Sequence, residues 1–342
     1  MTRKLRILVP MHEDLVPPDS IEGLSDEQMA PWKTEYDIVV TLKDIGHQVQ
    51  PLGVSSDLGV VGQAIEQFKP HIAFNLLEEF HGVGLYDQHV VSYLELVRLP
   101  YTGCNPRGLT LAHDKALTKM ILNYHRIRVP AFGVFPIDKA VRRPKRLQFP
   151  LLVKSLTEEG SVGIAQASIV HDDQHLAERV EFVHRQLQTH AIAEQYIEGR
   201  ELYVGVIGND RLQTFPIWEL SFTKLRDDAP RIATGKVKWD LAYRKKVGAT
   251  TRAAHDLPPG LETKIPHLCK RIYRTLGLSG YARIDLRLTP DGRVYLLEAN
   301  PNPELAYGED FAESAETTGV SYEQLLHRIL HLGLTYRPRG LA

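Results

Sequence analysis

The sequence predicts an α/β unit followed by α+β units in a chain of 342 residues. Three observations lead to this fold class. Strand-like and helix-like segments alternate up to about residue 107, short β-rich runs follow a helix after Asp114, and an Asp-Gly turn joins two β-rich runs near the C-terminus. A chain of this length exceeds what one hydrophobic core usually supports, so two or three packed units are expected.

The first unit alternates in the manner of a parallel sheet covered by helices. "LRILVP" has the pattern of a buried strand, and "EYDIVVTLKDIG" predicts a helix that ends at Gly46, before another short strand. Next come a strand "HIAFNLL", a helix "GLYDQHVVSYLELVRLP" and the end of a strand, "YTG". This order predicts a parallel α/β domain over residues 1–107. The polar segment 11–31 is either a ligand-binding loop at the carboxyl end of the sheet or a structural insertion.

The second and third units carry more β structure. A helix "KALTKMILNYHRI", two β-rich runs "FPLLVKS" and "GIAQASIV" and a helix "HLAERVEFVHRQL" predict a small α+β unit over residues 108–190. The remainder, residues 191–342, predicts a mostly antiparallel sheet closed by the helix "SYEQLLHRILHLG".

A hairpin in the third unit gathers oxygen donors. The turn "TPDGR" folds "RIDLRL" back against "VYLLEAN", so Asp285 and Glu298 can face each other, with Asn300 on the same side as Glu298. A site with only two carboxylates and one amide oxygen is suited to Mg²⁺ that substrate phosphates also coordinate. Arg283 shares this face and must pair with the carboxylates or hold another anion. The alternative is a structural network of ion pairs.

Two further segments have the chemistry of a nucleotide site. Lys154 ends a strand before the loop "EEGSVG", whose backbone N–H groups could cradle a phosphate. The alternative is a hairpin with a solvated lysine. In "IAEQYIEGREL", Glu194 and Glu201 flank apolar Tyr196 and Ile197, which could receive a flat heteroaromatic ring; alone, this segment is a strand and a turn.

Composition excludes several classes of protein. Lys plus Arg number 41 against 42 Asp plus Glu, so charge gives no reason to expect nucleic acid or a membrane surface as the main partner. Cys104 and Cys269 form no metal-binding or disulfide pattern. The apolar runs are too short for a signal peptide or a membrane span. A cytoplasmic protein is therefore expected.

Taken together and in order, these motifs resemble a known family. "HDKALTK", Lys154 before "EEGSVG", "EQYIEGRE", "ARIDLRL" and "LLEANPNP" resemble the ATP-grasp fold, and "LPYTG" and "GVSYEQLLHRIL" are similar to its D-alanine:D-alanine ligase-like branch. The resemblance covers about Ile72–Leu334. It implies an N-terminal parallel α/β domain on the substrate side (1–107), a small ATP-grasp lid (108–190), and a C-terminal ATP-grasp domain with the metal and catalytic site (191–342).

The resemblance also implies roles for individual residues. Two lysines and a loop would contact the ATP phosphates, a strand would meet adenine with Glu194 taking the amino group, and Glu201 would bind the ribose. The implied site residues are, for ATP, Lys115, Lys154, Gly160, Ser161, Val162, Glu194, Gln195, Tyr196, Ile197, Glu201 and Lys238; for two Mg²⁺ ions, or Mn²⁺, Asp285, Glu298 and Asn300; and for catalysis, Arg283, Lys154 and Ser161.

The implied reaction joins a small-molecule carboxylate to a small-molecule amine. ATP converts the carboxylate to an acyl phosphate, and the amine displaces the phosphate to form an amide or peptide bond. Mg²⁺ and lysines neutralise the transferred charge, and closure of the small unit keeps water out. The family resemblance also favours a homodimer. The alternatives are a D-alanine:D-alanine ligase of cell-wall synthesis and a non-catalytic nucleotide-binding protein.

The substrate half departs from the family pattern. Glu304 follows Pro303 where the family has a glycine near the reaction intermediate, and Glu309 aligns with a serine that holds the carboxylate of the second amino acid. An acid there would repel a carboxylate. We therefore expect substrates other than two D-alanines, with an amine that lacks a free carboxylate or carries extra positive charge. The alternative is that both glutamates point to solvent from a helix start.

Three other positions are less regular. Gly160 and Ser161 replace the family's paired serines in the phosphate loop. Glu13 is one candidate for the glutamate that binds the first substrate's ammonium group. A phosphate-contacting lysine in "KVKWDLAYRKKVG" is either Lys238 or Lys246.

Overall fold

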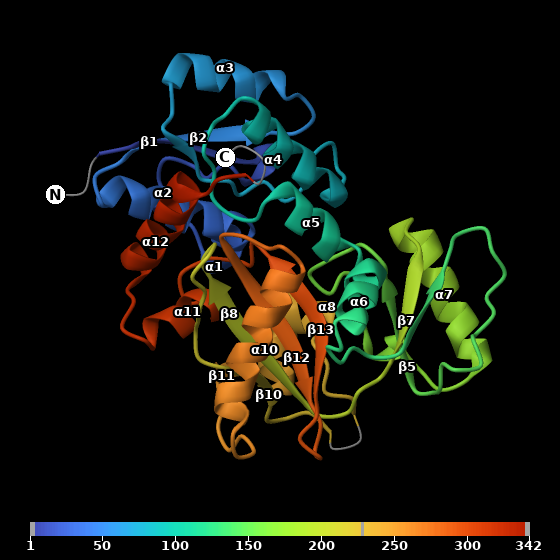
Figure 1. Ribbon diagram of the computed structural model, residues 1–342. Coiled ribbons are helices and arrows are strands. Elements are labelled where there is room, and N and C mark those ends of the chain that lie inside the picture. Colours follow the sequence, from blue (N-terminus) through green and yellow to red (C-terminus); the bar gives the residue numbers. More distant parts are fainter. Residues whose placement is uncertain (1–3, 227–228, 339–342) are drawn as a thin grey trace.

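The computed structural model describes residues 4–226 and 229–338, so the basic start of the chain and the predicted outer domain limits at residues 1 and 342 lie outside the described residues. Three units are visible in Figure 1: an N-terminal α/β unit (blue), a small lid unit (green to yellow) and a C-terminal unit built on the largest sheet (orange). The C-terminal helix α12, Tyr322–Thr335, returns to pack beside α2 of the N-terminal unit.

The N-terminal sheet has three parallel strands in the order β2-β1-β3, which confirms the predicted parallel α/β unit. Helix α3 was not expected from the sequence, and segment 11–31 contains short helical turns. The elements are β1 (Arg6–His12), η1 (Glu13–Leu15), α1 (Asp26–Met29), η2 (Ala30–Trp32), α2 (Lys33–Asp44), β2 (Gln48–Val54), α3 (Gly59–Phe68), β3 (Ile72–Ala73), η3 (Gly84–Tyr86) and α4 (Asp87–Leu96).

The lid unit contains a four-stranded sheet in the order β4-β7-β5-β6. Its strand β7 pairs with β4 and β5, so the unit extends beyond the predicted limit at residue 190, and the limit at residue 107 falls inside α5. The predicted strand "GIAQASIV" is mostly irregular because a 3-10 turn precedes a two-residue strand. The elements are α5 (Pro106–His113), α6 (Lys115–Tyr124), β4 (Phe132–Phe135), β5 (Leu151–Ser155), η4 (Gln166–Ser168), β6 (Ile169–Val170), α7 (Asp173–Leu187) and β7 (Ala191–Gln195).

The C-terminal unit is a mainly antiparallel sheet in the order β11-β10-β8-β12-β13, with β9 paired to β8. This arrangement agrees with the sequence pattern, including the hairpin between β12 and β13. The elements are β8 (Arg200–Ile207), β9 (Gln213–Thr214), β10 (Trp218–Phe222), α8 (Gly235–Trp239), α9 (Leu241–Val247), β11 (Ala249–Ala253), α10 (Leu261–Thr275), β12 (Tyr281–Leu288), β13 (Val294–Pro301), α11 (Asp310–Glu316) and α12.

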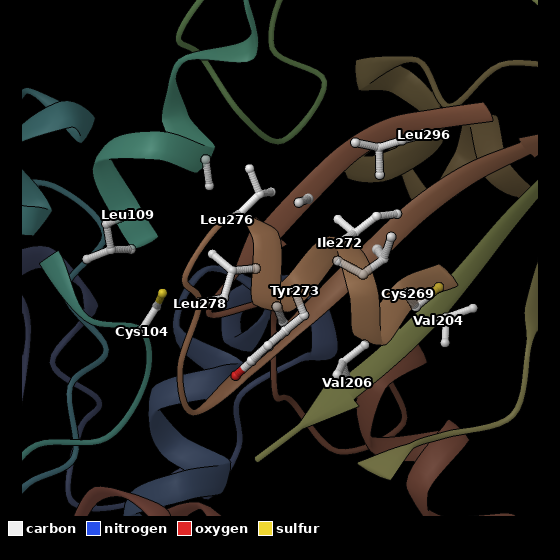
Figure 2. Close-up of a cluster of buried hydrophobic side chains, with 14 of the residues drawn as sticks. Cys104, Leu109, Val204, Val206, Cys269, Ile272, Tyr273, Leu276, Leu278 and Leu296 are labelled. Carbon is white, nitrogen blue, oxygen red and sulfur yellow. The ribbon is translucent and has the colours of Figure 1, made fainter. Parts of the chain in front are cut away.

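The largest apolar core lies between α10 and one face of this sheet. Figure 2 shows Cys269 and Ile272 of α10 beside Val204 of β8 and Leu296 of β13, and Cys104 enters the same core from the N-terminal side. Both cysteines are buried free thiols. Because this face of the sheet is fully covered, the polar residues of the same strands must lie on the opposite face. The helices in the described ranges are each too short or too polar to cross a membrane.

Candidate active site

Three neighbouring strands place polar side chains on the face of the C-terminal sheet that points away from α10. Asp285 of β12 lies opposite Glu298 of β13, and Arg283 lies opposite Asn300. On the other edge of β12, Tyr203 of β8 lies opposite Asp285. Because directly opposite residues and residues two apart share a face, all five side chains line one surface.

A β-bulge at Leu297 sets this alignment. Leu286 pairs with Leu296, but Asp285 pairs with Glu298, so Leu297 has no partner across the ladder. If the regular register continued past Leu286 and Leu296, Leu297 rather than Glu298 would lie opposite Asp285. The carbonyl of Leu297 instead accepts a hydrogen bond from Nζ of Lys119 at 2.7 Å. The bulge therefore brings the two carboxylates together, as bulges beside active sites often re-aim a side chain.

Asp285 is held by two neighbours on this face. Nε and Nη2 of Arg283 donate to its two oxygens at 2.8 and 3.0 Å, and Nδ2 of Asn300 donates to Oδ2 at 2.8 Å. The guanidinium also lies 4.8 Å from the centre of the Tyr203 ring. Burial raises the pKa of Asp285, although the charge of Arg283 opposes this effect. The ion pair foreseen as the structural alternative is thus present, at the edge of the larger cavity described below.

Three buried lysines surround the buried Glu194 and the half-buried Glu298 beside this face. Nζ of Lys115 lies 3.0 Å from Oε1 of Glu298, and Oε1 of Glu194 lies 3.3 Å from Nζ of Lys119 and 3.2 Å from Nζ of Lys154. Burial lowers the pKa of Lys119 to about 8. Burial would raise the pKa of Glu298, but Lys115 and Lys154 outweigh it and hold this pKa well below its usual range. Three cations against two anions leave positive charge for a phosphate.

The oxygen donors fit a magnesium ion shared with phosphates. Oε1 of Glu298 and Oε1 of Glu194 are buried atoms that make ion pairs with the lysines but no hydrogen bond of regular geometry. Within the described ranges, no three His, Cys, Asp or Glu side chains are placed to hold a metal by themselves. Mg²⁺ typically binds one or two protein carboxylates and completes its coordination shell with water and substrate phosphates. Asp285, Glu298 and Asn300 would therefore supply enough protein ligands.

Residues 157–163, which we call the phosphate loop, connect β5 to η4. Ser155 Oγ accepts hydrogen bonds from the backbone N–H groups of Thr157 and Glu158 at 3.2 and 2.9 Å, which fixes the start of the loop. Gly160 and Ser161 have positive φ angles of 63° and 61°. Consecutive residues bent in this way can turn backbone N–H groups toward one anion. Nε1 of Trp239 on α8 donates to the carbonyl of Gly160 at 2.9 Å.

The segment between β7 and β8 lines part of a smaller cavity of about 70 Å³. Glu201 is already satisfied there, because Tyr203 Oη and Arg287 Nη2 each donate to it at 2.8 Å. This cavity brings together most of the residues predicted to bind ATP: Lys154, Ser161, Glu194, Gln195, Tyr196, Ile197, Glu201 and Lys238, with Asp285 and Glu298. Ligand pockets usually measure roughly 300–1,000 Å³, so the walls must separate to admit a nucleotide.

A larger cavity of about 910 Å³ adjoins this site. The predicted residues Gly160, Val162, Lys238, Arg283, Asn300, Glu304 and Glu309 line it. Lys238 lines both cavities, whereas Lys246 is exposed on α9 and lines neither, so Lys238 is the better candidate for the phosphate contact.

Carboxylates outnumber lysines and arginines around the larger cavity. Glu309 precedes α11 and is half-buried; burial, Glu304 and Asp310 raise its pKa to about 7, although Arg244 and Lys33 oppose the rise.

Glu78 faces the same cavity from the loop after β3. Its side chain has solvent access, but protein surrounds it, and desolvation together with Glu159, Glu35 and other carboxylates raises its pKa to about 8. Groups with such raised pKa values beside a pocket often mark a binding or catalytic site.

Two motifs of the sequence meet at the rim of this cavity. Gly103 of "LPYTG" has a φ of +94°, and a Cβ there would lie 2.5 Å from Oδ1 of Asn302 in "EANPNP". Asn302 Oδ1 accepts a hydrogen bond from the backbone N–H of Cys104 at 2.7 Å. Glycine is therefore required where the N-terminal unit contacts the exit of β13.

One predicted substrate residue lies elsewhere. Glu13 is exposed in η1 and lines neither cavity, whereas Glu78 does. "HIAFNLLEEF" ends a strand of a parallel sheet, and acids at that edge could have been recognised as cavity residues. His113, Lys119, Trp239 and Arg287 were also missed. Lys119 follows Lys115 by one helical turn, which was the one available indication.

Comparisons with known proteins agree with this arrangement. The family model described as "D-ala D-ala ligase C-terminus" matches residues 122–331. A D-alanine–D-alanine ligase of Bordetella petrii is 32% identical over 249 residues, covering 72% of this chain and 71% of the relative. The uncharacterized protein y4sG of Sinorhizobium fredii is 28% identical over 305 residues, covering 86% and 85%.

A solved structure has the same fold. The D-alanine–D-alanine ligase of Bacillus anthracis, complexed with ATP, superposes with a TM-score of 0.74 at 23% identity, covering 96% of this chain and 97% of that one. The motif order, the strand register and the family match point to the same conclusion. The chain belongs to the D-alanine–D-alanine ligase family of ATP-dependent carbon–nitrogen ligases, with an ATP-grasp fold.

Proposed function

We propose that this ligase activates a small carboxylate with ATP and joins it to an amine that carries additional positive charge, rather than joining two D-alanines. The observation that carries the proposal is the acidic wall of the larger cavity, formed by Glu78, Glu304 and Glu309. It lies beside Arg283 and the end of β13, where the activated carboxylate would meet its nucleophile.

The smaller cavity supports the activation half of the reaction. Lys115, Lys154 and Lys238 would surround the triphosphate, and the phosphate loop would cover it with backbone N–H groups. Asp285, Glu298 and Asn300 would hold Mg²⁺, which when bound neutralises phosphate charge during transfer. The backbone of residues 195–197 would meet adenine.

Arg283 stands between the two halves. Its guanidinium is held by Asp285 and lines the larger cavity. A fixed cation here would orient the substrate carboxylate and stabilise the oxyanion that forms when the amine attacks the acyl phosphate. The amine must lose a proton in this step, while a second cationic group of the same substrate keeps its charge.

The acidic wall determines which amine fits. A free amino acid would bring a carboxylate toward Glu309 and Glu304. Two like charges about 4 Å apart repel by roughly 4 kcal/mol at an effective dielectric near 20, more than one hydrogen bond offsets. A cation in the same place would instead restore ionisation of these acids. Both glutamates line the cavity; Glu309 is half-buried at the start of α11, whereas Glu304 is also exposed to solvent.

A D-alanine–D-alanine ligase of cell-wall synthesis is the second candidate, because the curated relative from Bordetella petrii bears that name. A non-catalytic nucleotide-binding protein is less well supported, since binding alone would not need Arg283 together with Asp285, Glu298 and Asn300.

An ADP-release assay with mass detection of products separates these candidates. Purified protein, Mg-ATP and a panel of carboxylates would be tested with 1,4-diaminobutane, D-alaninamide or D-alanine as the amine. We expect coupled product with the diamine or the amide and little with D-alanine. Glu309→Ser should broaden acceptance toward free amino acids, whereas Glu316→Ser, an exposed acid on the same helix, should not. Efficient coupling of two D-alanines by the unaltered protein would refute the proposal.

A homodimer and a cytoplasmic location stay predictions. Sedimentation of the purified protein and fractionation of the source cells would test them.

A further inference from the structure

The imidazole of His113 joins two carboxylates from different parts of the chain. His113 ends α5 and is 7% exposed. Its Nε2 lies 2.9 Å from Oδ2 of Asp87 at the start of α4, and its Nδ1 lies 2.9 Å from Oε1 of Glu159 in the phosphate loop. A neutral imidazole has only one N–H and an ionised carboxylate can only accept. With both carboxylates ionised, both contacts are therefore hydrogen bonds only when the ring is protonated at both nitrogens; burial raises the pKa of Asp87, and the contact with His113 opposes this rise.

The surroundings favour that charged ring. Burial opposes the charge, but hydrogen bonds to Asp87 and Glu159 outweigh burial and raise the pKa of His113 to about 10. Two other ionisable groups act on the bridge: Glu78 interacts with both carboxylates, and Cys104 interacts with Asp87. Neither adds positive charge, so the imidazolium is the counter-ion of this cluster.

The same short segment of chain holds the loop at two further points. Nζ of Lys115 donates to the carbonyl of Glu158 at 2.7 Å, and the backbone N–H of Lys115 donates to the carbonyl of Leu156 at 3.4 Å. Residues 113–115 thus contact residues 156–159 through side chains and backbone. On the far side, Trp239 holds Gly160. The position of the loop depends on both sets of contacts.

Glu159 poses an electrostatic problem for a loop of this kind. It directly precedes Gly160, where we propose that the backbone receives ATP phosphates. A free carboxylate there would repel the triphosphate. His113 neutralises Glu159 and draws its side chain toward Asp87.

We propose that His113 is a positioning residue that acts through Glu159: it neutralises this carboxylate and ties the phosphate loop to α4, so that the loop can receive the phosphates of ATP. The inference rests on the proposed role of the phosphate loop. It goes beyond that role because it assigns a function to a charged bridge that touches neither the nucleotide nor the metal ligands.

A double-mutant cycle tests the proposal. Binding of the ATP analogue AMPPNP with Mg²⁺ would be measured by calorimetry for His113→Asn, Glu159→Gln and the double variant. We expect His113→Asn to weaken binding about tenfold or more, because it frees a carboxylate beside the phosphates. Glu159→Gln removes the charge but keeps a side-chain acceptor for His113, so it should weaken binding much less than His113→Asn does. In the double variant the repelling charge is gone, so most of the binding lost in His113→Asn should return, and the part that does not return measures the lost tie to α4. Hydrogen exchange in residues 157–163 should be faster in His113→Asn.

Matched variants separate the possible failures. His175→Asn removes an exposed histidine that pairs with Asp172 at 2.7 Å on the lid, and it should leave binding unchanged. Lys154→Ala tests the nucleotide site itself. If Lys154→Ala weakens binding but His113→Asn does not, or if the double variant stays as weak as His113→Asn, the inference is wrong while the site stands. If neither substitution alters binding, the proposed phosphate site is wrong.

A spectroscopic measurement covers the case in which His113→Asn does not fold. The ring nitrogens of His113 should have imidazolium chemical shifts at pH 8.5 in the unaltered protein, with the resonance identified by its change in Glu159→Gln. A neutral ring at this pH would overturn the proposal without any variant of His113.

Discussion

Replacing Glu309 with glutamine should stabilise the protein at high pH while weakening its hold on a cationic amine. Burial and two neighbouring acids raise the pKa of Glu309 from 4.5 to about 7. A raised pKa in the folded state means that the folded protein keeps a proton that the unfolded chain has lost. Stability attributable to Glu309 is therefore present below pH 4.5 and is lost as the pH rises through 7.

The size of the effect follows from the same shift. Each pH unit between the two pKa values corresponds to 1.36 kcal/mol, which gives an upper value of about 3 kcal/mol above pH 7. Solvent at the half-buried side chain reduces this to about 1–2 kcal/mol. Glu309 makes no capping hydrogen bond at α11, so no cap is lost. An anion at a helix start can contribute about 0.3–1 kcal/mol, which works in the opposite direction.

Thermal unfolding at two pH values would measure this effect. With an unfolding entropy of about 2.1 cal/mol/K per residue, 1–2 kcal/mol corresponds to a rise of about 1–3 °C in Tm. We expect Glu309→Gln to show that rise at pH 8.5 and a much smaller difference at pH 5, where the folded protein already holds the proton. Glu316→Gln on the exposed face of α11 is the control. A Tm difference between the two variants that does not change with pH would refute the electrostatic argument.

Two substitutions and one hydrogen-exchange measurement test the nucleotide-binding half of the site. Glu298→Gln should reduce ADP formation by several orders of magnitude, because a metal carboxylate is lost; loss of the 3.0 Å contact with Lys115 should lower Tm only modestly, and outright unfolding would favour a structural ion-pair role. Lys154→Ala should weaken AMPPNP binding by about 1.5–3 kcal/mol in calorimetry, and unchanged affinity would remove Lys154 from the site. Hydrogen exchange in residues 157–165 and 233–248 should slow with Mg-ATP and substrate if both segments close over the phosphates, whereas equal exchange would argue against closure.

The sequence was most informative where a local pattern determines the structure. The Asp-Gly turn predicted the hairpin of β12 and β13, and alternation predicted that Arg283 and Asp285 share a face. The pairing of Asp285 with Glu298 was predicted for an incomplete reason, because the hairpin alone would place Leu297 opposite Asp285. The bulge corrects the register, and its residue Leu297 accepts a hydrogen bond from the distant Lys119, a tertiary contact that no local pattern reveals.

Contacts between segments far apart in the chain were the main features that the sequence did not predict. His113 ends a helix and Glu159 lies in a loop 46 positions later, so only the tertiary fold brings them within hydrogen-bonding distance. Similarly, β7 follows the lid helix but pairs with β4 and β5, which moved the predicted limit of the lid. Strand pairing of this kind is decided by burial across the whole unit, and a one-dimensional pattern shows only that a strand exists.

The smaller cavity is rich in positive charge and the larger cavity in acidic groups, as the proposed ligase reaction requires. The nucleotide side holds three buried lysines against two glutamates, whereas the other side carries carboxylates whose pKa values are raised to about 7 and 8. Arg283 lies at the boundary. An anionic triphosphate would thus be drawn to one side and a cationic amine to the other, and the acyl phosphate would form where the two fields meet. The acids reduce stability at neutral pH, and a cost of this kind is expected at a binding site whose ligand supplies the missing counter-charge.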